Sequence, residues 1–200
     1  MRVGGRAQVI ADRGGPSTIV WYDATGVTVV LDDTTRRDMA RLDFRKTPQF
    51  ENLIGLDAHR PGYGQRDFRR LLRVDLAGCL ESGQLLNWVS SVQFGTSVGT
   101  KGQLRGERES LGSDVEAQAM SDAGEIPDRV PLTIRLFDDP SLQGRQGVAC
   151  LFELTIQDQL FRLIPLPLEL HSALEREIAF VGEKLAADLN DDVPLFRGRP

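Results

Sequence analysis

The fold is decided by the stretch Cys150-Leu-Phe-Glu-Leu-Thr-Ile156, the polar break Gln157-Asp-Gln159, and Leu160-Phe-Arg-Leu-Ile164. Phe152, Leu154 and Ile156 alternate with polar neighbours, and the same period of two resumes after the break. This alternation is typical of two half-buried strands joined by a turn. Prolines at 165 and 167 predict the end of the second strand, because proline has no N–H to donate to a ladder.

An amphipathic helix is expected after the prolines, since Ala173, Leu174, Ile178, Val181 and Leu185 recur at the helical period. Upstream, the same reasoning predicts strands at 18–22, 27–31, 39–44, 94–98, 104–109, 115–120 and 132–136, and helices at 48–55, 65–80 and 84–91. We therefore expect an α+β fold, with an antiparallel sheet body and two or three amphipathic helices. Its expected parts are a flexible or edge-strand arm at 1–17, a single domain at 18–189 and an extended tail at 190–200.

Composition narrows the class of protein. The formal net charge is −5, and acidic and basic residues are interspersed, so no large basic surface for duplex nucleic acid is indicated. No apolar run is long enough to cross a bilayer, and no signal segment opens the chain, so we expect a cytosolic protein without a membrane partner. Cys79 and Cys150 are expected to be buried, unpaired thiols.

The residues also fail to suggest a catalytic centre, a metal site or a cofactor. His59 and His171 lack acidic partners at a recognisable spacing, so both are interpreted as surface or helix-capping residues. The acidic pairs at 32–33, 138–139 and 191–192 lack the lysine or glutamate of a nuclease-like site, and turn formation accounts for them. We therefore expect no enzyme activity.

Order and spacing of several short motifs point to a family. They are Val29-Val-Leu-Asp-Asp33, Lys46-Thr-Pro48, Gln65-Arg-Asp-Phe68, Val130-Pro-Leu-Thr-Ile-Arg-Leu-Phe137, the hairpin ending in Pro165, and Val193-Pro-Leu-Phe196. With these motifs the chain resembles the YfdQ-like phage and prophage proteins, a domain of unknown function. The resemblance runs from about Thr18 to the C-terminus. It implies a phage or prophage origin, an α+β fold and a location in the cytoplasm of an infected or lysogenic bacterium, and it implies no activity.

An arginine-rich helix face is the strongest nucleic-acid candidate in the sequence. Its members, spaced three or four apart, are Arg66, Arg69, Arg70 and Arg73. One interpretation is a phosphate-binding stripe, and the other is a solvated face partly neutralised by Asp67 and Asp75. The second interpretation is favoured here, because the chain offers little aromatic surface beside the arginines for base stacking.

The tail is the strongest candidate for an oligomer interface. After the charged break at 190–192, Pro194 fixes an extended backbone, so its apolar side chains need a groove elsewhere. Burial of two such side chains is worth roughly 1.5–3 kcal/mol each. The groove can belong to the same chain or to another subunit, and another subunit is favoured here. The residues expected in this contact are Val193, Leu195, Phe196 and Arg197.

The leading functional hypothesis is a non-enzymatic phage protein that acts by self-association into a homo-oligomer, such as a ring or a shell. The first alternative is a nucleic-acid-binding accessory of phage recombination or replication, since relatives in the resembled family tend to be encoded near such functions. The second alternative is a protein that sequesters a small molecule or nucleotide in a pocket.

Overall fold

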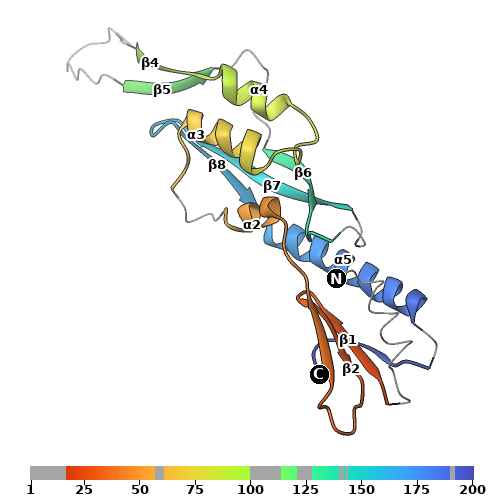
Figure 1. The fold of residues 1–200 in the computed structure, drawn as a ribbon. Coiled ribbons are helices and arrows are strands. Elements are labelled where there is room, and N and C mark those ends of the chain that lie inside the picture. Colours follow the sequence, from red (N-terminus) through yellow and green to blue (C-terminus); the bar gives the residue numbers. More distant parts are fainter. Residues whose placement is uncertain are drawn as a thin grey trace.

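The computed structural model describes residues 17–56, 61–99, 114–120, 128–139, 142, 144–189 and 192–200. The described chain forms an elongated α+β molecule, which confirms the expected fold class (Figure 1). Its helices are α2 (Pro48–Ile54), α3 (Gln65–Arg70), α4 (Gln84–Ser91) and α5 (Pro167–Asp188). The central sheet consists of β6 (Arg129–Arg135), β7 (Arg145–Thr155) and β8 (Leu160–Pro165). A hairpin consists of β4 (Gln93–Gly99) and β5 (Asp114–Met120). A small sheet consists of β1 (Ile19–Asp23), β2 (Gly26–Val30), β3 (Met39–Asp43) and β9 (Leu195–Arg197).

The central sheet contains the strand pair predicted at 150–164. β7 pairs antiparallel with β6 on one side and with β8 on the other, and Pro165 is the last residue of β8, opposite Cys150. Helices α3 and α4 cover one face through a cluster of rings, in which Phe68 and Trp88 contact Phe152 and Phe161. Burial of such rings contributes a large share of core stability, so this cluster fixes the two helices on the sheet.

Each outer edge of the central sheet forms an isolated bridge with another segment of the chain. Tyr63 forms an isolated bridge with Phe161 on β8, and Leu80 forms one with Leu132 on β6. Beyond the end of β6, Lys46 bridges to Phe137 in the same manner. At these positions the strand edge is already occupied, which limits edge-to-edge association there.

Helix α5 joins the central sheet to the small sheet, as Figure 1 shows. At about 1.5 Å per residue its 22 residues span about 33 Å, which is enough to contact both sheets. Near the central sheet, the buried Glu177 accepts a hydrogen bond of 2.9 Å from the Gln146 amide. Near the small sheet, Gly182 of α5 lies directly against the Tyr22 ring of β1. The helix is therefore the main brace between the central sheet and the small sheet.

The predicted helix at 65–80 is shorter than expected. Helix α3 ends at Arg70 and continues as one π-helical turn, η1 (Leu71–Asp75), in which the Leu76 amide donates to the Leu71 carbonyl at 2.9 Å. Gly78 then turns the chain with a φ of +73°, and Leu80 reaches the sheet edge. The apolar spacing that suggested one long helix arises because Phe68, Leu71, Leu72, Leu76 and Cys79 all reach the core across this irregular turn.

The hairpin of β4 and β5 extends away from the body, at the end of the molecule opposite the small sheet (Figure 1). Its base is held by Phe94, whose ring lies 5.9 Å from that of Phe161. β5 pairs with β4 along its whole length. The sequence also predicts a strand at 104–109. The segment 104–109 itself lies outside the described residues.

Candidate functional site

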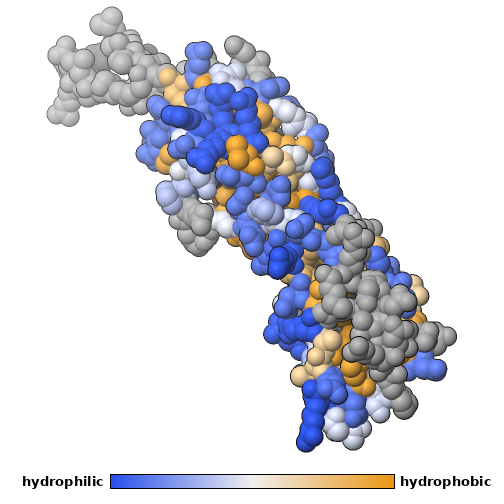
Figure 2. All heavy atoms as spheres, viewed as in Figure 1, coloured by the Kyte–Doolittle hydropathy of each residue, from blue (hydrophilic) through white to orange (hydrophobic). Residues whose placement is uncertain are grey.

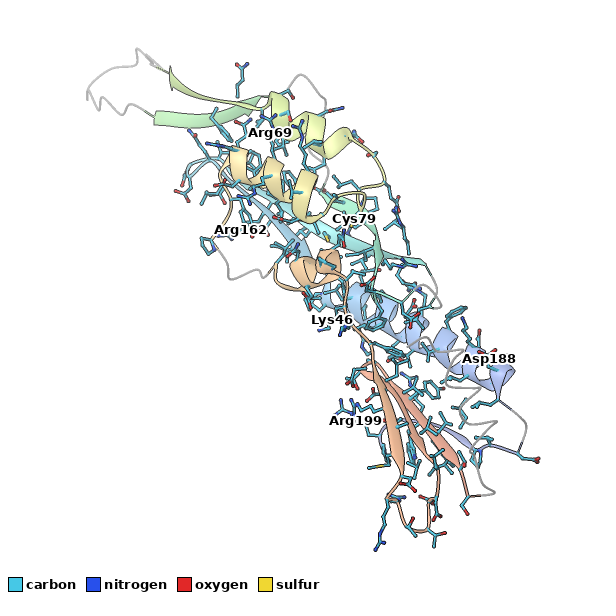
Figure 3. The ribbon with its side chains drawn as sticks, in the orientation of Figure 1. Lys46, Arg69, Cys79, Arg162, Asp188 and Arg199 are labelled. Carbon is cyan, nitrogen blue, oxygen red and sulfur yellow. The ribbon has the colours of Figure 1, made fainter. Side chains whose placement is uncertain are left out.

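One cavity lies where β6 and β7 meet the start of α2 and the turn after η1. Its volume is about 460 Å³ and one side is open to solvent. Its lining combines backbone and side chains from four segments: Thr47, Pro48, Gln49, Ala77, Gly78, Cys79, Thr133, Arg135, Asp138, Gly144 and Arg145. Figure 3 labels Cys79 at this junction of helix and sheet.

Two arginines dominate the electrostatics of this cavity. Arg135 ends β6 and Arg145 begins β7, and the register places them directly opposite each other. Directly opposed like charges destabilise a pair of strands. Arg145 donates one hydrogen bond of 3.0 Å to the Gly78 carbonyl, whereas within the described residues the Arg135 guanidinium has no hydrogen bond or ion pair. Sequence analysis missed both residues, because their convergence depends on strand register.

The remaining polar groups of the cavity are mostly engaged. The Thr47 hydroxyl donates to the Arg135 carbonyl at 2.5 Å and caps α2, and the Thr133 hydroxyl donates to the Glu81 carboxylate at 2.8 Å. Burial raises the pKa of the Cys79 thiol, and the nearby Arg145 charge offsets part of that rise. The guanidinium groups, together with the side chains of Gln49 and Asp138, therefore have unused capacity to bind a ligand.

The predicted arginine face lies on α3 and η1, on the side away from the core. Arg66, Arg70 and Arg73 are exposed and Arg69 is half-buried. Figure 2 shows hydrophilic residues gathered over α3, and Figure 3 labels Arg69 there. None of the four forms an ion pair with another described residue. Their side chains therefore form an exposed cationic stripe, as the spacing predicted.

The tail does not lie where the sequence predicted. β9 joins its own small sheet, parallel to β1, with Leu195 opposite Val20 and Phe196 opposite Trp21. Main-chain bonds hold it, from the Val20 amide to the Pro194 carbonyl and from the Gly198 amide to the Tyr22 carbonyl. Within this chain the tail therefore pairs with the edge of β1, and not with a groove on another subunit as predicted.

Side chains of the tail are also engaged within the chain. Arg197 pairs with Glu175 of α5 at 2.5 Å, and Leu195 and Val193 pack half-buried against the core. Phe196 stacks on Trp21 with ring centroids 4.9 Å apart and stays 44% exposed. The reason for the difference from the prediction is that extended backbone satisfies its polar groups most readily at a strand edge, and β1 supplies one.

The histidines, the acidic pair at 32–33 and the cysteines that the sequence analysis considered form no metal site among the described residues. His171 is exposed on α5, and His59 lies outside the described residues. Asp32 and Asp33 form a turn with Thr34, Thr35 and Arg36. Within the described part of the chain no cluster of three or more metal-ligating side chains occurs. Cys79 and Cys150 are free and buried as predicted, and burial raises the pKa of the Cys150 thiol to about 12.

Comparisons with known proteins add no relative. The chain matches no family model, no curated protein and no solved structure. The resemblance to the YfdQ-like proteins therefore stays a prediction. Among the helices described, none combines the length and the apolar character needed to span a bilayer.

Proposed function

We propose that this protein is a non-enzymatic, cytoplasmic protein of phage origin that works by associating with copies of itself through the β4–β5 hairpin. One observation supports this proposal above the others. The hairpin extends from the body, and in the described chain its two strands pair with each other and with no further strand (Figure 1).

The physical reason is the state of the two strand edges. A two-stranded hairpin is only marginally stable in water, and its outer edges present rows of unpaired N–H and C=O groups. Each outer edge of the central sheet, by contrast, forms an isolated bridge with another segment of the same chain. Two strand edges with no partner strand in the described part of the chain favour strand addition from neighbouring subunits, which continues the ladder on both sides.

The proposed assembly is a closed ring. When the β4 edge of one subunit meets the β5 edge of the next, the contact is heterologous, and repeated heterologous contacts close into a ring if the rotation allows. In such a ring the hairpins form one continuous sheet and the bodies point outward from it. The tail does not take part, because β9 is already a strand of its own small sheet.

A pair of shortened variants tests the role of the hairpin. Phe94 and Ala119 are cross-strand partners, so replacing 95–118 by Asn-Gly closes a short hairpin at that register and removes the projecting part. The matched control joins the partners Gly99 and Asp114 by Asn-Gly, which removes 100–113 and keeps both strands. Native mass is measured by size-exclusion chromatography with light scattering, and circular dichroism checks folding.

We expect the intact protein and the control to share an oligomeric mass, and the variant without the projecting strands to elute as a folded monomer. The proposal fails if the intact protein is a monomer at micromolar concentration. It also fails if the variant that lacks 95–118 keeps the full assembly mass.

Nucleic-acid binding is a second candidate function, supported by the cationic stripe on α3 and η1. Four arginines without an ion pair among the described residues can each bind a phosphate. The test compares Arg66→Gln/Arg70→Gln/Arg73→Gln with the control Arg36→Gln/Arg41→Gln, whose arginines are paired with Asp33 and Asp43. Fluorescence anisotropy with single- and double-stranded DNA across salt concentrations is the measurement.

If the stripe binds phosphates, the triple variant weakens binding and reduces the salt slope by about one for each phosphate that it no longer binds. The control variant leaves both the affinity and the salt slope unchanged. Binding that is absent at low salt in the intact protein, or equal in both variants, removes this candidate.

A further inference from the structure

The cavity between β6, β7 and the start of α2 has a charge arrangement that a ligand would complete. Arg135 and Arg145 face each other across the strand pair, and no carboxylate among the described residues forms an ion pair with either. Asp138 is the acidic residue in the lining, so the two guanidinium groups leave it with net positive charge. An anion placed between the guanidinium groups would relieve their repulsion.

The shape of the guanidinium groups and the size of the cavity indicate which class of anion fits. A guanidinium presents a planar fork of donors that suits the paired oxygens of phosphate. The cavity, at about 460 Å³, falls in the range of small-molecule sites and has room for more than a phosphate group. Gln49 and Asp138 add an amide and a carboxylate to the lining, and these suit the hydroxyl groups of a sugar.

We propose that this cavity binds a small phosphorylated sugar, with Arg135 and Arg145 holding the phosphate and Asp138 and Gln49 facing the sugar hydroxyls. The site lies within one subunit and far from the hairpin, so it does not depend on the proposed assembly. It also differs from the stripe on α3, because its arginines are on the central sheet.

Arg135→Gln is the sharpest variant for this proposal. The Arg135 side chain has no hydrogen bond or ion pair within the described residues. The substitution therefore removes its contacts with the ligand and its repulsion with Arg145, and it breaks no hydrogen bond or ion pair among the described residues. We expect the ligand-free variant to be at least as stable as the parent protein. Arg145→Gln is less clean, since it also removes the bond to the Gly78 carbonyl. Arg129→Gln is the matched control, an exposed arginine on the same face of β6 and outside the cavity.

Isothermal titration calorimetry with ribose 5-phosphate, inorganic phosphate and ribose, at constant ionic strength, tests the proposal. We expect saturable binding of ribose 5-phosphate, weaker binding of inorganic phosphate and none of ribose. Affinity for ribose 5-phosphate should fall at least about tenfold in Arg135→Gln, as removal of a charged hydrogen bond predicts, and stay within about twofold in Arg129→Gln. The variant that lacks 95–118 should bind as the intact protein does.

Two results overturn the proposal. The first is no saturable binding of ribose 5-phosphate, whether or not inorganic phosphate binds. The second is an affinity for ribose 5-phosphate that Arg135→Gln leaves unchanged, because the phosphate would then lie elsewhere.

Discussion

Asp23 shows at the scale of one residue how the two ends of the described chain are tied together. Its carboxylate accepts hydrogen bonds from the Thr25 amide at 2.7 Å and from the Gly26 amide at 3.1 Å, which shapes the turn between β1 and β2. The same carboxylate accepts from the Arg199 Nε at 2.7 Å. Asp23 therefore connects the turn between β1 and β2 to the tail. Figure 3 labels Arg199, the tail residue of this pair.

Asp23 should make stability depend on pH in the acidic range. Burial alone would raise the pKa of this carboxyl, but the hydrogen bonds from Thr25 and Arg199 outweigh it and lower the pKa to about 2 from 3.8. A depressed folded-state pKa contributes stability that is present above the unfolded pKa and lost as the pH falls through the folded one. We expect the stability advantage of the parent over Asp23→Asn to shrink between about pH 4 and pH 2. Urea unfolding at several pH values measures it, and an advantage that stays constant over that window contradicts the assignment.

At the scale of elements, α5 determines how the small sheet sits on the molecule. Gly182 has no side chain where the helix meets β1, and a Cβ built there would lie 2.7 Å from Cζ of Tyr22. Such a distance cannot be accommodated without movement of the ring or the helix. The close approach therefore depends on glycine at this position, although glycine is a poor helix former.

Gly182→Ala should destabilise the fold. Overpacking costs about 1–3 kcal/mol, which exceeds the roughly 1 kcal/mol that alanine gains over glycine within a helix. We expect a net loss of up to about 2 kcal/mol in the free energy of unfolding, measured with urea. In a Tyr22→Ala background the same change should be neutral or stabilising, since the ring is gone. A loss of equal size in both backgrounds would mean that Tyr22 is not the cause.

Deleting the tail should weaken the fold and leave the assembly intact. Removal of 193–200 takes away β9, its main-chain bonds to β1 and the pairs of Arg197 with Glu175 and Arg199 with Asp23. We expect a lower thermal midpoint with an unchanged subunit count by light scattering. A truncated protein that keeps its thermal midpoint but loses its oligomeric mass would instead support a tail that binds another subunit.

The elements with strong periodicity were predictable, and those set by distant contacts were not. The strands at 150–164 and helix α5 follow from local alternation and helical spacing. Residues 65–80 carry the same helical spacing, yet α3 ends at Arg70 and Leu80 forms a bridge with Leu132 of β6. Strand partners were harder still, because β9 and the facing pair Arg135 and Arg145 depend on registers between segments far apart in the chain.

At the scale of the whole molecule, the two ends are built for different tasks. The body and the small sheet are braced by α5 and share one cluster of buried apolar residues. The β4–β5 hairpin projects at the other end (Figure 1), and no third strand among the described residues pairs with either of its edges. A rigid body that carries a projecting, incomplete sheet is well suited to assembly, because the missing strand partners can come from identical neighbours.

Hydrogen exchange in the hairpin, followed by mass spectrometry as a function of protein concentration, tests this account most directly. Amides that point outward from β4 and β5 exchange quickly in a monomer and slowly when a neighbouring strand accepts their hydrogen bonds. Protection in peptides covering 93–99 and 114–120 should therefore rise across the concentration range in which the mass rises, while peptides from the central sheet stay unchanged. Hairpin amides that exchange at the same fast rate in monomer and assembly would contradict the central claim.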